Sequence, residues 1–258
     1  MNPLKPSHRS GSLAGLFMLL LLASHTAVAV PTHIMVRAQS LDAKFIADGI
    51  GGARVLIEDA ESGELLDQGM IRGSTGDTER IMSQPHQRRQ RLSDEGTGGY
   101  LATVDIERPR WVRIRVLAPY GRRQALQEAS VTTWVLPGRD LTAGDGIVLQ
   151  MPGLIVDGWT QMMKDGRLMI MAEVTMLCGC PITPDGLWKA EEFTLEALPE
   201  LGGERFGPVE MKFSSESGLF IGEFRPPKPG TYRVLISAFQ PSTGNTGVAR
   251  TQRKVSLP

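Results

Sequence analysis

Short segments in which hydrophobic and polar residues alternate recur along most of the chain, and they predict β-strands rather than helices. In one of them, Val112, Ile114 and Val116 face one way, while the tryptophan and arginines between them face the other. Gly, Pro, Asp and Ser separate the segments, as is typical of turns. The strands predicted in this way are Arg54–Glu58, Tyr100–Glu107, Trp111–Val116, Val131–Leu136, Leu154–Val156, Leu168–Met176, Phe193–Leu198, Val209–Phe213, Leu219–Phe224, Tyr232–Phe239 and Val248–Leu257.

The strand pattern is interrupted at Pro152 and Gly153, which predicts a boundary between two domains. The first domain would cover residues 30–150 and the second residues 151–258, and each has the size and strand number of a β-sandwich. Residues 72–99 lack this periodicity and are rich in Gly, Ser, Thr, Gln and charged residues. They predict a long mobile insertion in the first domain, with one helical turn at Thr78–Met82.

Residues 1–29 have the features of a secretory signal peptide. Lys5 and Arg9 precede the apolar run Leu13–Ala23, and Ala27-Val28-Ala29 supplies a small-x-small cleavage pattern. We therefore expect cleavage before Val30. No second apolar stretch follows, so the mature chain should have no transmembrane segment. The compartment expected from these features is the periplasm or the exterior of a Gram-negative bacterium.

The charge of the chain is balanced, with 28 basic and 28 acidic residues. A balanced surface gives little electrostatic attraction to nucleic acid or to an anionic membrane, so neither is an expected partner. The basic run His86–Arg91 is a local exception, and we interpret it as part of a solvated loop because Asp94 and Glu95 follow it.

The segment Pro229-Gly230-Thr231-Tyr232, followed by Gly244-Asn245-Thr246-Gly247, resembles the closing strands of bacterial exported immunoglobulin-like modules. The resemblance implies two tandem immunoglobulin-like β-sandwich domains. Modules of this kind serve adhesion, spacing, substrate presentation or assembly, so the resemblance also implies that the partner is another exported or membrane protein. It identifies no functional residue, because function is not set by the fold.

The two cysteines of the chain, Cys178 and Cys180, offer the most specific chemistry. If the strand that begins at Leu168 continued to Cys180, then Met176, Cys178 and Cys180 would project from one face, because side chains alternate along a strand. Thioether and thiolate sulfur favour Cu(I) over harder metals. One hypothesis is therefore a Cu(I) site formed by these three residues.

A disulfide between Cys178 and Cys180 is the competing prediction, since exported proteins meet oxidising conditions. Two residues apart on an extended strand, α-carbons lie about 6.6 Å apart, near the upper limit for a disulfide, so Gly179 would have to bend the chain. Such a bridge would either take part in thiol-disulfide exchange or have a purely structural role. Trp188, which follows closely, is expected to be buried and to brace the turn.

Enzyme signatures are absent from the sequence: there is no Gly-x-Ser-x-Gly, no His-Glu-x-x-His and no phosphate-binding loop. The predicted function is therefore an exported, non-enzymatic binding or assembly protein. The alternatives are a periplasmic copper-binding accessory protein and a thiol-disulfide exchange protein.

The other three tryptophans, Trp111, Trp134 and Trp159, are expected to pack against sandwich edges or the domain junction.

Overall fold

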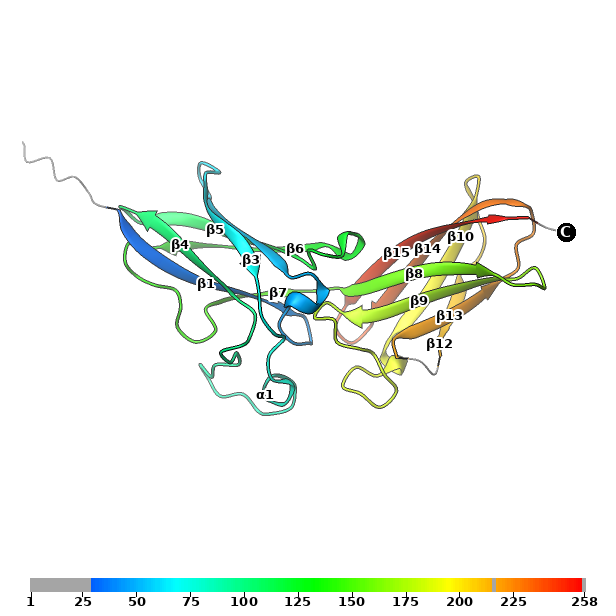
Figure 1. Cartoon of the computed structure of the whole chain (residues 1–258), viewed down its shortest axis with the longest axis horizontal. Helices are drawn as coiled ribbons and strands as arrows, with labels where there is room; N and C mark the ends of the chain where they lie inside the picture. Colours follow the sequence, from blue (N-terminus) through cyan, green and yellow to red (C-terminus); the bar gives the residue numbers. More distant parts are fainter. Residues whose placement is uncertain (1–28, 215–216, 257–258) are drawn as a thin grey trace, which may run out of the picture.

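The computed structural model describes residues 29–214 and 217–256, and these form an all-β chain in two halves. The halves lie end to end, with β1 starting at one end of the long axis and the C-terminus at the other (Figure 1). The predicted all-β, immunoglobulin-like sandwich architecture is confirmed. The predicted signal peptide lies, except for its last residue, outside the described residues.

The first half consists of two sheets that enclose a hydrophobic core. Their strand orders are β4-β1-β7 and β3-β2-β5-β6, and all pairs are antiparallel except β1 with β7. The predicted inward residues Val112, Ile114 and Val116 are fully buried, so the alternation identified the core face of β5 correctly. The strands are β1 (Val30–Ser40), β2 (Ala53–Asp59), β3 (Leu65–Ile71), β4 (Tyr100–Ile106), β5 (Arg110–Ala118), β6 (Gln127–Val135) and β7 (Ile147–Met151).

The second half is one sheet that folds over into two layers around a second core. Its strand order is β15-β14-β10-β12-β13-β9-β8, and β12 pairs with β10 at one end and with β13 at the other. The two end strands also meet, because a Cβ added at Gly247 of β15 would lie 2.6 Å from the carbonyl oxygen of Leu154 on β8. The strands are β8 (Leu154–Met162), β9 (Leu168–Met176), β10 (Thr194–Leu201), β11 (Glu204–Arg205), β12 (Val209–Phe213), β13 (Leu219–Phe224), β14 (Gly230–Gln240) and β15 (Asn245–Val255).

Tyr232 anchors the corner on which the immunoglobulin-like resemblance rests. Its side chain is fully buried, and its hydroxyl donates a hydrogen bond of 3.0 Å to the carbonyl oxygen of Lys228. Its ring packs against Phe206 and Phe224, with centroid distances of 5.8 and 5.5 Å. A buried tyrosine that bonds back to the backbone just upstream is typical of immunoglobulin-like corners.

The segment Arg72–Gly99 contains the helical turn expected in it, α1 (Thr78–Met82). The last part of the segment is held to the sheet. The buried guanidinium of Arg37 donates to the carbonyl oxygens of Thr97 and Gly98 at 2.6 and 2.7 Å, and the carboxylate of Asp145 accepts from the amides of residues 92 and 93. High mobility of Arg72–Gly99 stays a prediction.

Four strands were not predicted: β1, β3, β7 and the two-residue β11. In β3 the run Asp67-Gln68-Gly69 breaks the alternation, and only Ile71 of this strand is buried. The remaining helices are single 3₁₀ turns, η1 (Asp48–Ile50), η2 (Arg123–Ala125) and η3 (Ala190–Glu192). Within the described ranges no helix is long and apolar enough to cross a membrane.

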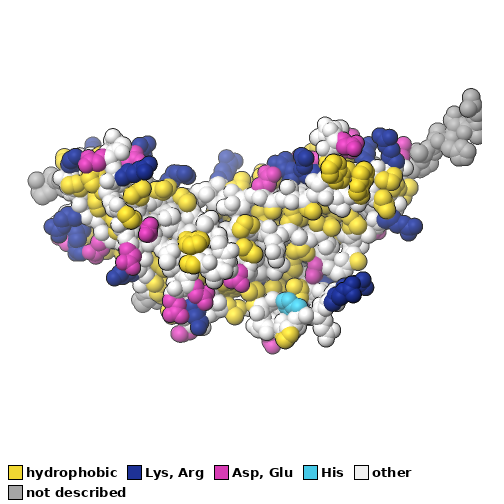
Figure 2. Space-filling view, turned by 180° about the vertical axis from the view of Figure 1, so that it is seen from behind, with side chains coloured by type: hydrophobic (Ala, Val, Ile, Leu, Met, Phe, Trp, Pro, Cys, Tyr) yellow, Lys and Arg dark blue, Asp and Glu magenta, His cyan; other side chains and the backbone are white. Residues whose placement is uncertain are grey.

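Hydrophobic side chains also reach the surface. On the face shown in Figure 2, they gather near the end of the first half from which β1 starts, with Lys and Arg side chains among them.

Candidate functional site

Cys178 and Cys180 lie in a tight turn after β9. They do not lie on a continuation of that strand, which the Cu(I) hypothesis required. The strand ends at Met176, whose carbonyl oxygen accepts from the amide of Gly179 at 2.8 Å, while its own amide donates to the carbonyl oxygen of Cys180 at 3.1 Å. Gly179 adopts a φ of 78°, a left-handed conformation that costs glycine little. The turn brings the two cysteine α-carbons to 5.3 Å, closer than the extended spacing assumed from the sequence.

The two sulfur atoms form a disulfide, which was one of the sequence-based alternatives. Met176 is fully buried, and Cys178 and Cys180 are only 4% and 6% exposed. All three belong to the hydrophobic core of the second half. Disulfide sulfur carries no thiolate charge, so this arrangement gives the Cu(I) hypothesis no support. The described residues also contain no group of three or more His, Cys, Asp or Glu side chains able to hold a metal ion.

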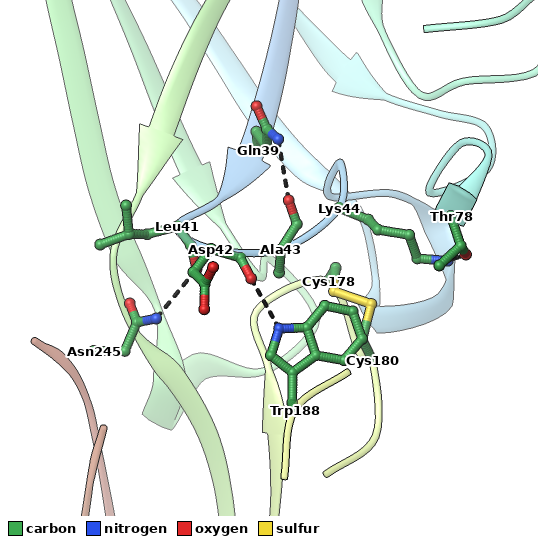
Figure 3. The surroundings of a disulfide bond; sticks show 10 residues. All are labelled: Gln39, Leu41, Asp42, Ala43, Lys44, Thr78, Cys178, Cys180, Trp188 and Asn245. Carbon is green, nitrogen blue, oxygen red and sulfur yellow. Dashed lines mark hydrogen bonds between the residues drawn. A yellow bond between two sulfur atoms is a disulfide. The ribbon is translucent and has the colours of Figure 1, made fainter. Parts of the chain in front are cut away.

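The cysteine turn lies where the two halves meet. Leu177 belongs to the core of the first half, although both neighbouring residues belong to the core of the second. A Cβ added at Gly179 would lie 2.7 Å from a methyl carbon of Ile50 in the first half. Trp188 lies beside the disulfide, as Figure 3 shows, and it is buried as predicted. The disulfide therefore braces a turn that contacts both halves.

Residues 41–43 of the first half project into the second half beside this turn (Figure 3). The indole nitrogen of Trp188 donates to the carbonyl oxygen of Asp42 at 2.8 Å. The amide nitrogen of Asn245, a fully buried residue, donates to the carbonyl oxygen of Leu41 at 3.1 Å. The amide oxygen of Asn245 accepts from the backbone of Gly153, in the link between β7 and β8, at 2.8 Å. These hydrogen bonds fix the orientation of one half relative to the other.

A second set of contacts crosses the junction through η2. Arg122 forms an ion pair of 3.2 Å with Asp157 of β8, and Gln124 donates to the carbonyl oxygen of Val156 at 2.8 Å and to Asp157 at 2.7 Å. A cavity of about 220 Å³ lies between these residues and the cysteine turn. We refer to the cysteine turn, residues 41–43, Asn245 and η2 together as the junction. Its role in this arrangement is to hold the halves together.

Three of the four tryptophans are exposed, so the expectation that they pack against sandwich edges or the junction was wrong. Trp111 of β5 and Trp134 of β6 are 44% and 58% exposed, and Trp159 of β8 is 41% exposed. Trp111 and Trp134 are directly opposite each other in the strand pairing, and their rings stack at a centroid distance of 6.2 Å with 20° between their planes. The alternation correctly predicted that Trp111 points outward. It could not show whether another segment of the chain packs over that side of the sheet.

Two arginines, Arg113 and Arg115, lie on the same outward side of β5 as Trp111. Arg115 is paired with Glu58 at 3.1 Å and with both carboxylate oxygens of Glu128 at 2.9 Å. Hydrogen bonding by Arg115 lowers the pKa of Glu128, and the two carboxylates raise the pKa of Arg115. Arg113 is exposed and has no ion pair with any described residue. We define the tryptophan face as the outward side chains Trp111, Arg113, Arg115, Ser130, Thr132 and Trp134.

No model of a known protein family matches the chain, and no curated protein matches it. Among solved structures, the chain is similar to the chicken interferon gamma receptor alpha chain, with 11% identity and a TM-score of 0.33. The similarity covers 90% of this chain and 100% of the receptor chain. We draw no conclusion about ligands or partners from so weak a likeness.

Proposed function

We propose that this chain is an exported, non-enzymatic binding or assembly protein, of the periplasm or the exterior of a Gram-negative bacterium, and that the tryptophan face contacts its protein partner. The observation that carries the proposal is the exposed, stacked pair Trp111 and Trp134. Large aromatic side chains left on the surface of a sheet are stabilised when a partner covers them. The signal-like N-terminus supports the proposed compartment.

The composition of the tryptophan face supports protein recognition. Tryptophan and arginine are the residues most enriched where binding energy is concentrated in protein interfaces. The two indoles offer apolar area on a rigid strand pair, and Arg113 adds a guanidinium that forms no ion pair with a described residue. The junction also supports the proposal, because it fixes the orientation of the two halves. A partner that contacts both halves then binds without a loss of conformational entropy for ordering one half relative to the other.

Photo-crosslinking in cells tests the proposal. A photoreactive amino acid replaces Thr132, an outward residue of β6 in the tryptophan face, and in a control it replaces Thr246, an exposed residue of β15. We expect an adduct with another envelope protein from position 132 but not from position 246. The adduct should disappear when Trp111→Ser and Trp134→Ser are introduced, and persist with Trp159→Ser. The proposal is contradicted if the adduct with another protein is missing, or if the first two changes leave the yield of that adduct unchanged.

A further inference from the structure

The outer edge of β6 carries no hydrogen-bonded strand among the described residues, although β7 of the other sheet passes close to it. β6 is the last strand in the order β3-β2-β5-β6, and all nine of its residues pair with β5 without a bulge. Among the described strands, none is hydrogen-bonded to its other side. An edge strand presents a row of unpaired N–H and C=O groups, which is a template for another strand.

The opposite edge of the same sheet, β3, is held against β4 by side-chain hydrogen bonds. There, the carboxylate of Asp67 on β3 accepts from the backbone amide of Thr103 on β4 at 2.8 Å and from the hydroxyl of Tyr100 at 2.9 Å. The Tyr100 ring lies over Gly69, since a Cβ added there would be 2.0 Å from the ring. The end strands of the second half meet each other at Gly247 and Leu154.

β6 also lacks the sequence devices that keep an exposed edge from pairing. Natural edges carry proline, bulges or charges that point inward. The sequence of β6 has no proline, and its one charged residue, Glu128, points outward and is paired with Arg115. Val131 lies on the core-facing side, opposite Ile114, and yet is 38% exposed. The core-facing side at the centre of β6 is therefore partly open to solvent.

We infer that the β6 edge pairs with the β6 edge of a second copy of this chain, antiparallel and centred on Val131, to form one continuous eight-stranded sheet. This register places Val131 against Val131 of the second copy and Ser130 against Thr132. It pairs all nine residues of β6, and it keeps the inward face of each copy on the same side of the joint sheet.

The side chains of β6 are complementary to themselves in this register. Glu128 of each copy lies opposite Trp134 of the other, so like charges are never opposed. The carboxylate of Glu128 keeps its pairing with Arg115, and no unpaired charge is buried under the indole. Two valines meet at the centre, and β-branched pairs favour strand association. The outcome is a twofold-symmetric dimer with a tryptophan face on each side of the axis.

The inference goes beyond the proposed function and does not depend on it, because the dimer is held by the backbone groups of the β6 edge, whereas the partner would contact the outward side chains of β5 and β6. Sedimentation of the purified chain starting at Val30, at about 1–100 µM, measures the mass directly. We expect twice the monomer mass at the upper concentrations. Val131→Lys should raise the dimer dissociation constant about tenfold or more, because two ammonium groups then face each other across the axis. Val131→Thr is the matched control and should still form the dimer.

A charge-swap mixture tests the register. Val131→Lys and Val131→Glu should each be monomeric alone, and an equal mixture of the two should form a dimer. Circular dichroism and thermal unfolding show whether each variant is folded. A monomeric wild type at 100 µM, or a dimer that Val131→Lys leaves unchanged, overturns the inference. A third outcome also overturns the inference: the wild type is monomeric, and Val131→Lys abolishes its crosslink from position 132 to a different protein. The β6 edge would then pair with a strand of that other protein.

Discussion

Asn245→Ala is the change that tests the junction most strongly. The side-chain amide of Asn245 makes three hydrogen bonds, to the carbonyl oxygen of Leu41, the amide oxygen of Gln240 and the backbone amide of Gly153, at 3.1, 2.9 and 2.8 Å. Alanine leaves the Leu41 carbonyl and the Gly153 amide without these partners. Gln240 keeps its bond from the hydroxyl of Thr243 at 2.8 Å.

An unpaired buried backbone group costs about 1–3 kcal/mol. The Gly153 amide is buried and the Leu41 carbonyl is half-buried, so the variant should lose about 2–4 kcal/mol of unfolding free energy. That is a large part of the 5–15 kcal/mol typical of a folded protein. The loss falls on contacts between the halves, so the coupling between them should weaken as well. We expect the thermal unfolding of the variant, followed by differential scanning calorimetry, to separate into two transitions.

Urea unfolding gives the free energy for the same comparison. Thr246→Ala, at the exposed neighbouring position on β15, is the matched control and should change the free energy of unfolding by less than about 0.5 kcal/mol. A loss for Asn245→Ala no larger than that of the control would refute the idea that this amide couples the halves.

Three further predictions concern the corner, the insertion and the disulfide. Tyr232→Phe should lower the free energy of unfolding by about 1–2 kcal/mol in urea, because the phenol loses its bond to a backbone carbonyl; no loss would contradict the corner's role. Burial alone would raise the pKa of Asp145, but hydrogen bonds from two backbone amides and the charge of Arg37 hold it below the ordinary value. The ionised Asp145 therefore stabilises the folded segment above the ordinary Asp pKa of about 3.9, and this stabilisation is lost as the pH falls through the lower pKa of Asp145 in the folded protein. Pepsin should therefore cleave within Arg72–Gly99 faster near pH 2 than near pH 4. Asp145→Asn should remove most of that difference, and an unchanged pH dependence in Asp145→Asn would count against it. Cys178→Ser combined with Cys180→Ser should cost about 2 kcal/mol or less in urea and leave the circular dichroism spectrum unchanged, because a loop this short gives little chain-entropy stabilisation.

Much of the architecture could be predicted from the sequence because strand alternation is a local signal. β9, β12 and β13 have the predicted bounds, since each alternates clearly between turn residues. β3 was missed because its polar centre follows no period, and it is held at the edge of its sheet by Tyr100 and Asp67, which belong to different strands. Pairing between segments distant in sequence cannot be read from a single strand.

The candidate sites could also be predicted only as far as local sequence determines them. The spacing of Cys178 and Cys180 was enough to raise a disulfide as one option, and Gly179 supplied the necessary bend. Their position between the halves depends on Ile50 and on residues 41–43, which are far away in the sequence. The exposure of Trp134 likewise depends on which segments do not cover β6, and this is known only once the fold is known.

We propose that binding takes place at the tryptophan face and that the cysteine turn only holds the halves together. The most direct measurement is the yield of the partner adduct formed from position 132 in three backgrounds: wild type, Trp111→Ser with Trp134→Ser, and Cys178→Ser with Cys180→Ser. We predict a yield within about twofold of wild type for the cysteine variant and a decrease of about tenfold or more for the tryptophan variant, as expected for residues that dominate an interface. Loss of the adduct in the folded cysteine variant, with full yield in the tryptophan variant, would contradict the claim.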